Sequence, residues 1–308
     1  MKKPEFLKYE TLECDVRNTL SSGTTLVGIP TRDRPEYLSI LLSSLIFQTN
    51  QLFDVLIVDT SDRWDSILDM ENEYFNCPPV SRFIDTLKAQ GHAVLLKHVP
   101  VAGKSEVAAV NFIMTYATLN EYGYLYKTDD DHLLQPDLLA RLLYAFNQQK
   151  EPCLVSAMTP FMYRAKAGWS GPDSHAYLAF PPDARLTTIQ LKDDVADIDI
   201  GHFNRCTTDL GIIESDLASN ANFFMKPECK LLWEDIGHCS LFADAEWMLK
   251  LRHFFGFKFF FDTGCVSWHV TAPAGGVRDQ VGNYEKNSEW DNLRRRRLTY
   301  LLKEFSKE

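Results

Sequence analysis

Short apolar stretches alternate with longer stretches of helical spacing through the first half of the chain. The apolar stretches have the length of β-strands and cover residues 24–29, 53–58, 93–97, 124–127 and 154–158. The helical patterns lie between them, at 35–47, 80–90, 106–121 and 136–148. This β-α-β-α order predicts an α/β fold with a mostly parallel, Rossmann-like sheet that helices cover. Ligands bind such sheets beyond the carboxyl ends of the strands, so the loops that follow the strands are the first place to look for function.

The pattern changes after residue 158. Residues 159–216 are rich in proline, glycine and polar side chains and show little periodicity, which predicts an irregular insertion over the sheet. Further short strands are expected at 222–225, 258–262 and 265–268, and a further helix at 244–255. We expect an N-terminal extension at 1–22, one α/β domain at 23–270, and a mobile loop followed by an amphipathic helix at 271–308.

Composition limits the class of protein. The 308 residues are 45% hydrophobic and carry a formal net charge of −10, which fits a globular domain and argues against broad nucleic-acid binding. The seven cysteines form no C-x-x-C pair, so we expect reduced thiols and no zinc site. The N-terminal residues have no apolar signal core, and no stretch approaches the roughly 18 apolar residues of a transmembrane helix. We therefore expect a soluble, cytoplasmic protein, at most peripheral to a membrane.

Three adjacent carboxylates are the most informative chemical feature. Asp129, Asp130 and Asp131 follow the strand at 124–127 and precede a helix that begins with Pro136. Neighbouring carboxylates repel one another unless a counter-charge holds them together. A divalent cation such as Mg²⁺ or Mn²⁺ supplies that charge and also binds phosphate oxygens. The alternative is a solvated acidic turn, because aspartate is common at the start of a helix.

Polar residues follow other strands at the same predicted edge of the sheet. Pro30, Thr31 and Asp33 come after the first strand, and Asp59 ends the second. These carboxylates are candidates to bind a base or ribose, although helix capping is the alternative. Lys104 stands in a Gly-Lys-Ser sequence at the start of a helix, where backbone amides favour an anion. An ordinary surface lysine is the competing interpretation.

The ordered set of motifs resembles the inverting glycosyltransferase family 2, whose members have the GT-A fold and a D-x-D motif. The matching segments are LVGIPTRDRPEYLSILLSSLIFQT (26–49), VLIVDTSD (55–62), GKSEVAAVN (103–111), YKTDDDHLLQPDLL (126–139), DAEWMLKLRHFFGFK (244–258) and the Trp268-His269 pair. The resemblance implies that Asp129 and Asp131 hold the metal that binds the donor diphosphate, with Asp131 the more direct ligand. It implies that Asp130 belongs to the same donor site, and that His269 is a further metal ligand. For His269 the alternative is a core histidine.

The resemblance also implies how the donor and acceptor are handled. Pro30, Thr31, Asp33 and Asp59 would hold the nucleoside, although Asp59 is followed by Thr60 where many members have a second acidic residue. Asp244 would be the general base that takes the proton of the acceptor hydroxyl. Glu246 is its competitor, and helix capping is the structural alternative for Asp244. Arg278, in a loop that contains Gly275 and Gly276, would close over the diphosphate.

Together these features predict inverting transfer of a sugar, most often from a uridine diphosphate (UDP) donor in this family, with Mn²⁺ or Mg²⁺ as cofactor. The acceptor would be a glycan, a lipid-linked sugar or another hydroxyl compound. Its surface would come from the insertion at 160–220. Candidate acceptor-binding residues there and just beyond are Trp169, His175, Tyr177 and Asn222. For each of these four, ordinary packing is the alternative.

Other functions remain open from the sequence. A sugar-phosphate nucleotidyltransferase shares the sheet and the metal chemistry, and a non-enzymatic binding module is the third possibility. The run from Arg294 to Arg297 could contact anionic lipid or nucleic acid, and it would suit a glycosyltransferase acting on a modified nucleic-acid base. The alternative is a solvated helix face paired with acids such as Glu289 and Asp291.

Overall fold

The computed structural model describes residues 11–12, 24–61, 80–99, 106–160, 186–199, 209–227, 231–234, 243–270 and 284–307. The strands are β1 (Thr11–Leu12), β2 (Thr25–Thr31), β3 (Phe53–Asp59), β4 (Val94–His98), β5 (Tyr124–Thr128), β6 (His132–Leu134), β7 (Cys153–Met158), β8 (Thr188–Lys192), β9 (Val195–Asp199), β10 (Ile212–Ser215), β11 (Asn222–Met225) and β12 (Lys258–His269). The helices are α1 (Pro35–Ile46), α2 (Val80–Ala89), α3 (Glu106–Leu119), α4 (Leu138–Asn147), α5 (Ala243–Phe255) and α7 (Tyr284–Phe305).

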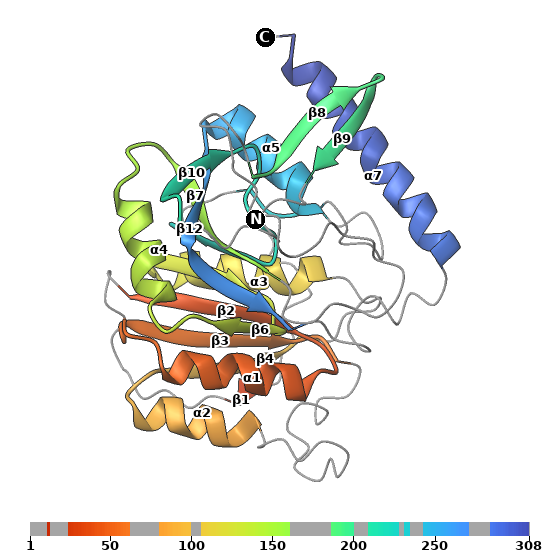
Figure 1. Ribbon diagram of the computed structural model, residues 1–308. Coiled ribbons are helices and arrows are strands. Elements are labelled where there is room, and N and C mark those ends of the chain that lie inside the picture. Colours follow the sequence, from red (N-terminus) through yellow and green to blue (C-terminus); the bar gives the residue numbers. More distant parts are fainter. Residues whose placement is uncertain are drawn as a thin grey trace.

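A large sheet with the order β1-β4-β3-β2-β5-β11-β7-β12-β10 forms the centre of the molecule (Figure 1). Strands β4, β3, β2 and β5 run parallel, β11 runs antiparallel between β5 and β7, and β12 runs parallel to β7. The carboxyl ends of β2, β3, β5 and β12 therefore lie at one edge of the sheet. This arrangement confirms the predicted α/β fold with a mostly parallel sheet.

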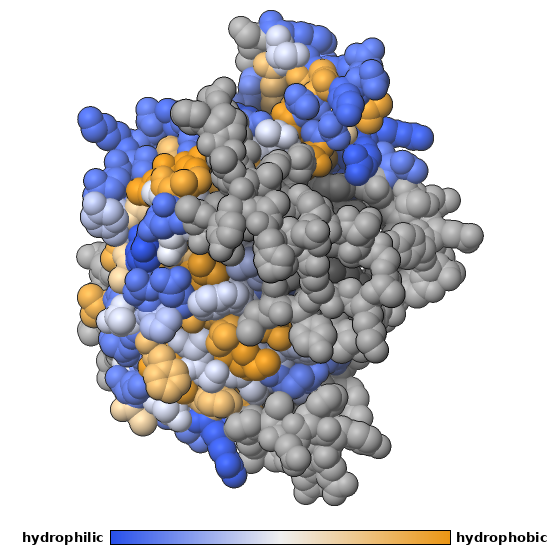
Figure 2. All heavy atoms as spheres, viewed as in Figure 1, coloured by the Kyte–Doolittle hydropathy of each residue, from blue (hydrophilic) through white to orange (hydrophobic). Residues whose placement is uncertain are grey.

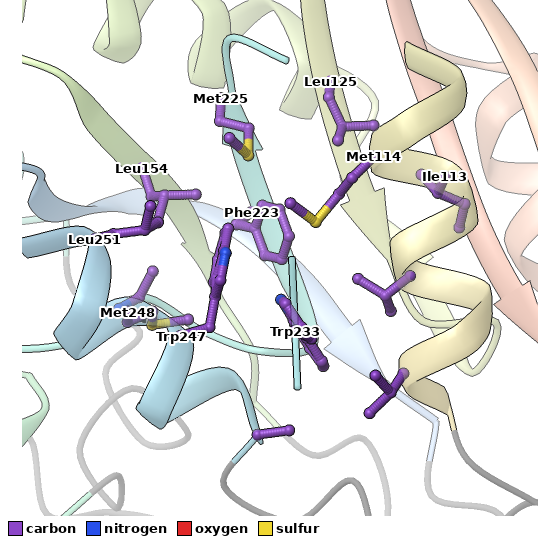
Figure 3. Close-up of a cluster of buried hydrophobic side chains, with 14 of the residues drawn as sticks. Ile113, Met114, Leu125, Leu154, Phe223, Met225, Trp233, Trp247, Met248 and Leu251 are labelled. Atoms are coloured by element: carbon purple, nitrogen blue, oxygen red, sulfur yellow. Dashed lines mark hydrogen bonds between the residues drawn. The ribbon is translucent and has the colours of Figure 1, made fainter. Parts of the chain in front are cut away.

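Alternate residues of the strands face two separate cores. Leu26, Leu125 and Phe223 face the side covered by α3 and α5, whereas their neighbours Val27 and Tyr126 face the side covered by α1, α2 and α4. Helices on both faces explain why β2 and β3 are buried along their whole length. Figure 3 shows Phe223 between Trp247 of α5 and Met114 of α3. This packing fixes α5 against the sheet.

The structure corrects the sequence interpretation at four places. The segments at 258–262 and 265–268 are one strand, β12, with a register shift between Asp262 and Val266. Beyond the shift, β12 pairs with β6, a short strand that the hydrophobic pattern did not indicate. The insertion contains the hairpin β8–β9 and strand β10, so it is partly regular. Residues of the N-terminal extension form β1, which pairs with β4.

The C-terminal helix packs onto the hairpin and onto α5 (Figure 1). The Ala196 amide donates a hydrogen bond to Thr299 Oγ1 (2.8 Å), and Leu298 is fully buried. Hydrophobic residues on the face shown in Figure 2 form separate small patches among hydrophilic ones. None of the described helices is long and apolar enough to cross a bilayer.

Candidate active site

Backbone hydrogen bonds hold the loops at the carboxyl edge of the sheet together. The Thr60 amide donates to the Thr31 carbonyl (3.0 Å), which joins the loops after β2 and β3. The Val270 amide donates to the Asp131 carbonyl (2.8 Å), which joins the end of β12 to the acidic triplet. The parallel order of the strands therefore places residues that are far apart in sequence in one site.

Asp131 is nearly buried and lies between two basic groups. Its Oδ2 accepts hydrogen bonds from Arg34 Nη1 (2.9 Å) and His269 Nε2 (3.2 Å). Its Oδ1 is buried and has no hydrogen-bond partner among the described residues. Burial alone would raise the pKa of Asp131, but His269 and Arg34 lower it well below its usual range. Asp131 is therefore an ionised carboxylate with one oxygen available for a ligand.

Asp130 faces the protein instead of the site, which corrects its prediction as a donor-binding residue. It is fully buried, and its carboxylate accepts hydrogen bonds from Thr31 Oγ1 (2.6 Å) and from Arg34 Nη2. Burial raises the pKa of Asp130 to about 7, and the neighbouring Asp131 adds to this, against the effect of Arg34. Its role in the structure is to join the acidic triplet to the end of β2.

Asp129, the other predicted metal ligand, belongs to a second group of charges. The buried Lys127 ammonium contacts Asp129 Oδ1, Glu106 Oε1 (2.9 Å) and the Asn220 carbonyl (2.7 Å). Burial alone would lower the pKa of Lys127, but Asp129 and Glu106 raise it. Lys127 is thus a permanent cation that already neutralises Asp129.

Two histidines stand beside Asp131. His132 and His269 are direct cross-strand partners of β6 and β12, and their rings stack with centroids 5.2 Å apart. One ligand atom from each histidine and one from Asp131 all lie within 4.8 Å of one another. Burial lowers the pKa of His132 to about 3, so its ring is neutral. A carboxylate with two imidazoles is a donor set that suits a first-row divalent metal.

The predicted nucleoside-binding residues lie at the ends of β2 and β3. Asp59 is fully buried; its Oδ1 accepts from the Ser61 amide (2.9 Å), and its Oδ2 has no hydrogen-bond partner within the described part of the chain. Burial raises the pKa of Asp59, against the hydrogen bonds from Ser61. Asp33 is partly exposed, and its amide donates to Ser61 Oγ (2.9 Å). Pro30 and Thr31 are buried parts of β2, so only their backbone remains a candidate for ligand contact.

Asp244 lies in the first turn of α5 and is partly exposed. Burial raises its pKa to about 6; the Ala245 backbone hydrogen bond lowers it and the charge of Glu106 raises it. Asp244 is therefore close to the charges around Lys127. The competing base, Glu246, is fully buried and accepts hydrogen bonds from Lys250, Arg294 and Arg297. Those hydrogen bonds exclude Glu246 as the base.

Two further predictions are wrong. Asn222 is fully buried in β11, and its Oδ1 accepts from the Ala157 amide (2.8 Å), so it does not face an acceptor. Arg294 is fully buried and Arg297 is ion-paired with Glu246, so the arginine run is not one solvated or phosphate-binding face. The predicted residues Lys104, Trp169, His175, Tyr177 and Arg278 lie outside the described residues.

Four charged or metal-ligating side chains of the site were not predicted from the sequence. Arg34 lies in the same polar loop as Asp33, and Lys127 and His132 flank the acidic triplet. Glu106 follows the Gly-Lys-Ser sequence. The signal was their place next to recognised motifs, but most of their partners lie far away in sequence, such as Asp131 for Arg34 and Ser267 for His132, and cannot be read from local sequence.

Comparisons with known proteins identify the family and the fold. The sequence matches Glycosyl transferase family 2 over residues 26–203, and no curated protein matches. A mannosyltransferase from Pyrobaculum calidifontis, PcManGT in complex with GDP-Man and Mn²⁺, superimposes with a TM-score of 0.52 and 15% identity over 89% of this chain and 62% of its own. S. aureus TarS in complex with UDP-GlcNAc gives a TM-score of 0.50 and 11% identity over 85% of this chain and 61% of its own.

These structural likenesses show a shared GT-A fold. The chain spans less than two thirds of the length of either structure, 62% and 61%. The family match covers more than half of the chain, and the protein therefore belongs to glycosyl transferase family 2.

Proposed function

We propose that the chain transfers one sugar, with inversion, from a nucleotide sugar to an acceptor hydroxyl, and that a divalent cation assists. The observation that carries this proposal is the position of Asp131, ionised between Arg34 and His269 with Oδ1 left for a ligand. It lies at the carboxyl edge of the sheet, where α/β proteins bind their ligands. The family membership and the GT-A fold agree with it.

The residues present fit a divalent cation. Within the described chain, the carboxylates of Asp129, Asp130, Asp131 and Glu106 face two cations, Arg34 and Lys127. Even with Asp130 protonated, the other three carboxylates outnumber the two cations, so the cluster keeps a negative charge. Asp131 would hold the ion through Oδ1. His269 would bind it through a deprotonated Nε2, which would exchange its hydrogen bond to Asp131 Oδ2 for the ion. A bound cation of this kind would stabilise the negative charge that develops on a departing diphosphate. Mn²⁺ is the expected ion, because an imidazole nitrogen is a better ligand for Mn²⁺ than for Mg²⁺.

The nucleoside would bind over the ends of β2 and β3. Asp59 Oδ2 is buried without a protein partner among the described residues, and such an atom is costly unless a donor such as a ribose hydroxyl or a base N–H reaches it. Asp33 stands beside it in the neighbouring loop. We propose uridine as the base, and Lys104 and Arg278 as cations for the diphosphate.

Asp244 would take the proton from the acceptor hydroxyl. Its raised pKa of about 6 makes it a stronger base than an ordinary aspartate, while it stays ionised at neutral pH. We propose that residues 23–270 form the catalytic domain, with the extension at 1–22 and the loop and helix at 271–308 outside it. The acceptor surface would come from 160–220, including Trp169, His175 and Tyr177.

The test is release of nucleoside diphosphate from a panel of donors, UDP-GlcNAc, UDP-glucose and GDP-mannose, with and without Mn²⁺. We expect turnover with one base only, dependent on Mn²⁺ and lost in Asp131→Asn. Asp85→Asn, an exposed aspartate of α2, is the matched control and should keep wild-type activity. If no donor is cleaved and none raises the thermal midpoint, the proposal is wrong, because a bound ligand must stabilise the fold.

A further inference from the structure

His132 is a fully buried histidine with an unexplained nitrogen. Its Nε2 has no hydrogen-bond partner within the described chain, and it lies 4.0 Å from Asp131 Oδ1, which also lacks one. Two buried polar atoms that face each other beyond hydrogen-bond distance are costly unless something binds between them. A single ion with metal–ligand bonds of roughly 2.1 Å spans up to about 4.2 Å between two ligand atoms.

We propose that His132 Nε2 is a third protein ligand, with Asp131 and His269, of one divalent cation, and that this two-histidine centre selects Mn²⁺ over Mg²⁺. This deepens the proposed function, on which it rests, by naming the ligand set and the ion of the same site. The ladder between β6 and β12 supports it. His132 and His269 are directly opposite in that antiparallel pair, so both side chains extend from the same face.

Ser267 orients the ring of His132. Its hydroxyl oxygen lies 2.6 Å from His132 Nδ1, and Ser267 is itself fully buried on β12. When Nδ1–H donates to that oxygen, Nε2 keeps its lone pair and is aimed at Asp131. Metal-binding histidines are held in this way by a second hydrogen bond from the other ring nitrogen. Ser267 is thus a positioning residue.

The choice of ion follows from the ligand types. Mg²⁺ prefers oxygen ligands and keeps several waters, whereas imidazole nitrogen suits Mn²⁺ and later first-row metals. The other nearby carboxylate, Asp129, is ion-paired through Oδ1 with Lys127. One carboxylate with two imidazoles therefore binds Mn²⁺ more tightly than Mg²⁺.

The test is an EPR titration of free Mn²⁺ with the metal-free chain, alone and with UDP, followed by competition with Mg²⁺. In His132→Asn, the side-chain amide takes the place of Nδ1 and can still hydrogen-bond Ser267, but the proposed ligand atom Nε2 is lost. We expect this substitution to raise the Kd for Mn²⁺ by about tenfold or more and to change the Kd for Mg²⁺ much less. His253→Asn, whose ring stacks on Phe305 away from the site, should leave both constants unchanged.

If His132→Asn and the wild type bind Mn²⁺ with the same Kd, the inference is wrong. It is also wrong if the wild type binds no Mn²⁺ with or without UDP, because the space between His132 Nε2 and Asp131 Oδ1 then holds only water. Pulsed EPR of Mn²⁺ bound to the wild type needs no variant, and should show two imidazole nitrogens; one nitrogen also overturns it. Donor cleavage is measured separately. If Mn²⁺ binds through His132 but no donor is cleaved and none raises the thermal midpoint, the proposed function is wrong and the metal centre is still supported.

Discussion

Arg294 Nη1 lies 2.8 Å from Glu246 Oε2, and this fully buried ion pair joins the C-terminal helix α7 to helix α5. Arg294 also donates through Nη2 to the Glu234 carbonyl (2.7 Å), and Arg297 donates to the same Glu246 carboxylate (2.9 Å). Asp244 lies two residues before Glu246, in the first turn of α5. The ion pair therefore fixes the start of the helix from which the proposed base extends.

Removal of one partner of this pair should destabilise the fold strongly. Glu246→Ala leaves the Arg294 guanidinium buried without its carboxylate, and breaking such a pair costs about 3–5 kcal/mol. Urea unfolding at pH 7 measures the loss. Arg296→Ala is the matched control from the same arginine run, because Arg296 is exposed and its loss should change stability by about 0.5 kcal/mol or less. Equal effects of the two substitutions would show that the pair contributes nothing.

The same carboxylate should make the protein sensitive to acid. Burial alone would raise the pKa of Glu246, but hydrogen bonds from Arg297, Lys250 and Arg294 lower it from 4.5 to about 2. A carboxyl that is more acidic in the folded chain stabilises the fold above its unfolded pKa. That stability is lost as the pH falls from about 4.5 towards 2. Unfolding free energies measured along this range should fall more steeply for the wild type than for Glu246→Gln, and parallel curves would contradict the assignment.

The pH dependence of the reaction should report Asp244. Only the ionised carboxylate accepts a proton, so kcat/KM should fall about tenfold per pH unit below its raised pKa of about 6. Asp244→Asn should lower kcat by about 10²–10⁴-fold with little change in donor affinity. Initial rates from pH 5 to 8, with Asp85→Asn as control, make the measurement. A variant that retains most of the wild-type kcat would remove Asp244 from the mechanism.

Glu106 offers a second check on the fall of kcat/KM at acidic pH. Its negative charge is one of the causes that raise the pKa of Asp244, whereas Lys127 lowers it. Glu106→Gln removes the charge that raises the pKa of Asp244 and leaves Lys127, which lowers it, so the fall of kcat/KM should move to lower pH. If the fall stays at the same pH or moves to higher pH, another group controls it.

The sequence was sufficient to predict the layered fold and the edge that carries the site. Strands such as β2 and β3 are buried on both faces, so their apolar runs are plain in the sequence, and the order of elements then fixes a mostly parallel sheet. Asp131, Asp59 and Asp244 could be selected as candidates because Asp131 follows a strand, Asp59 ends one and Asp244 lies in the first turn of a helix. Local pattern is informative when a residue's role depends on its own element.

The sequence could not distinguish the three adjacent aspartates from one another. Asp129 pairs with Lys127, Asp130 with Thr31 and Arg34, and Asp131 faces His269. The partners of Asp130 and Asp131 lie far away in sequence, up to 138 residues, whereas Lys127 lies two residues before Asp129 in β5. The same reason explains why the arginine run was taken for a surface feature, since Glu246 lies 48 residues before Arg294. Long-range pairing of charges has no local periodicity to reveal it.

Helix α3 approaches the sheet so closely at Gly28 that there is little room for a side chain at this position. A Cβ at this position of β2 would lie 2.2 Å from Ile113 Cγ2 on α3, and a β-branched side chain in a helix has little freedom to move away. Gly28→Ala should therefore destabilise the fold by about 1–3 kcal/mol.

Ile113→Ala removes the clashing methyl group, so in the Gly28→Ala background it should cost clearly less stability than it does alone. Leu87→Ala, on α2 at the opposite face, should cost the same in both backgrounds. Urea unfolding of the single and double variants gives these couplings, and a cost for Ile113→Ala that is the same with and without Gly28→Ala would show that the helix has shifted to make room.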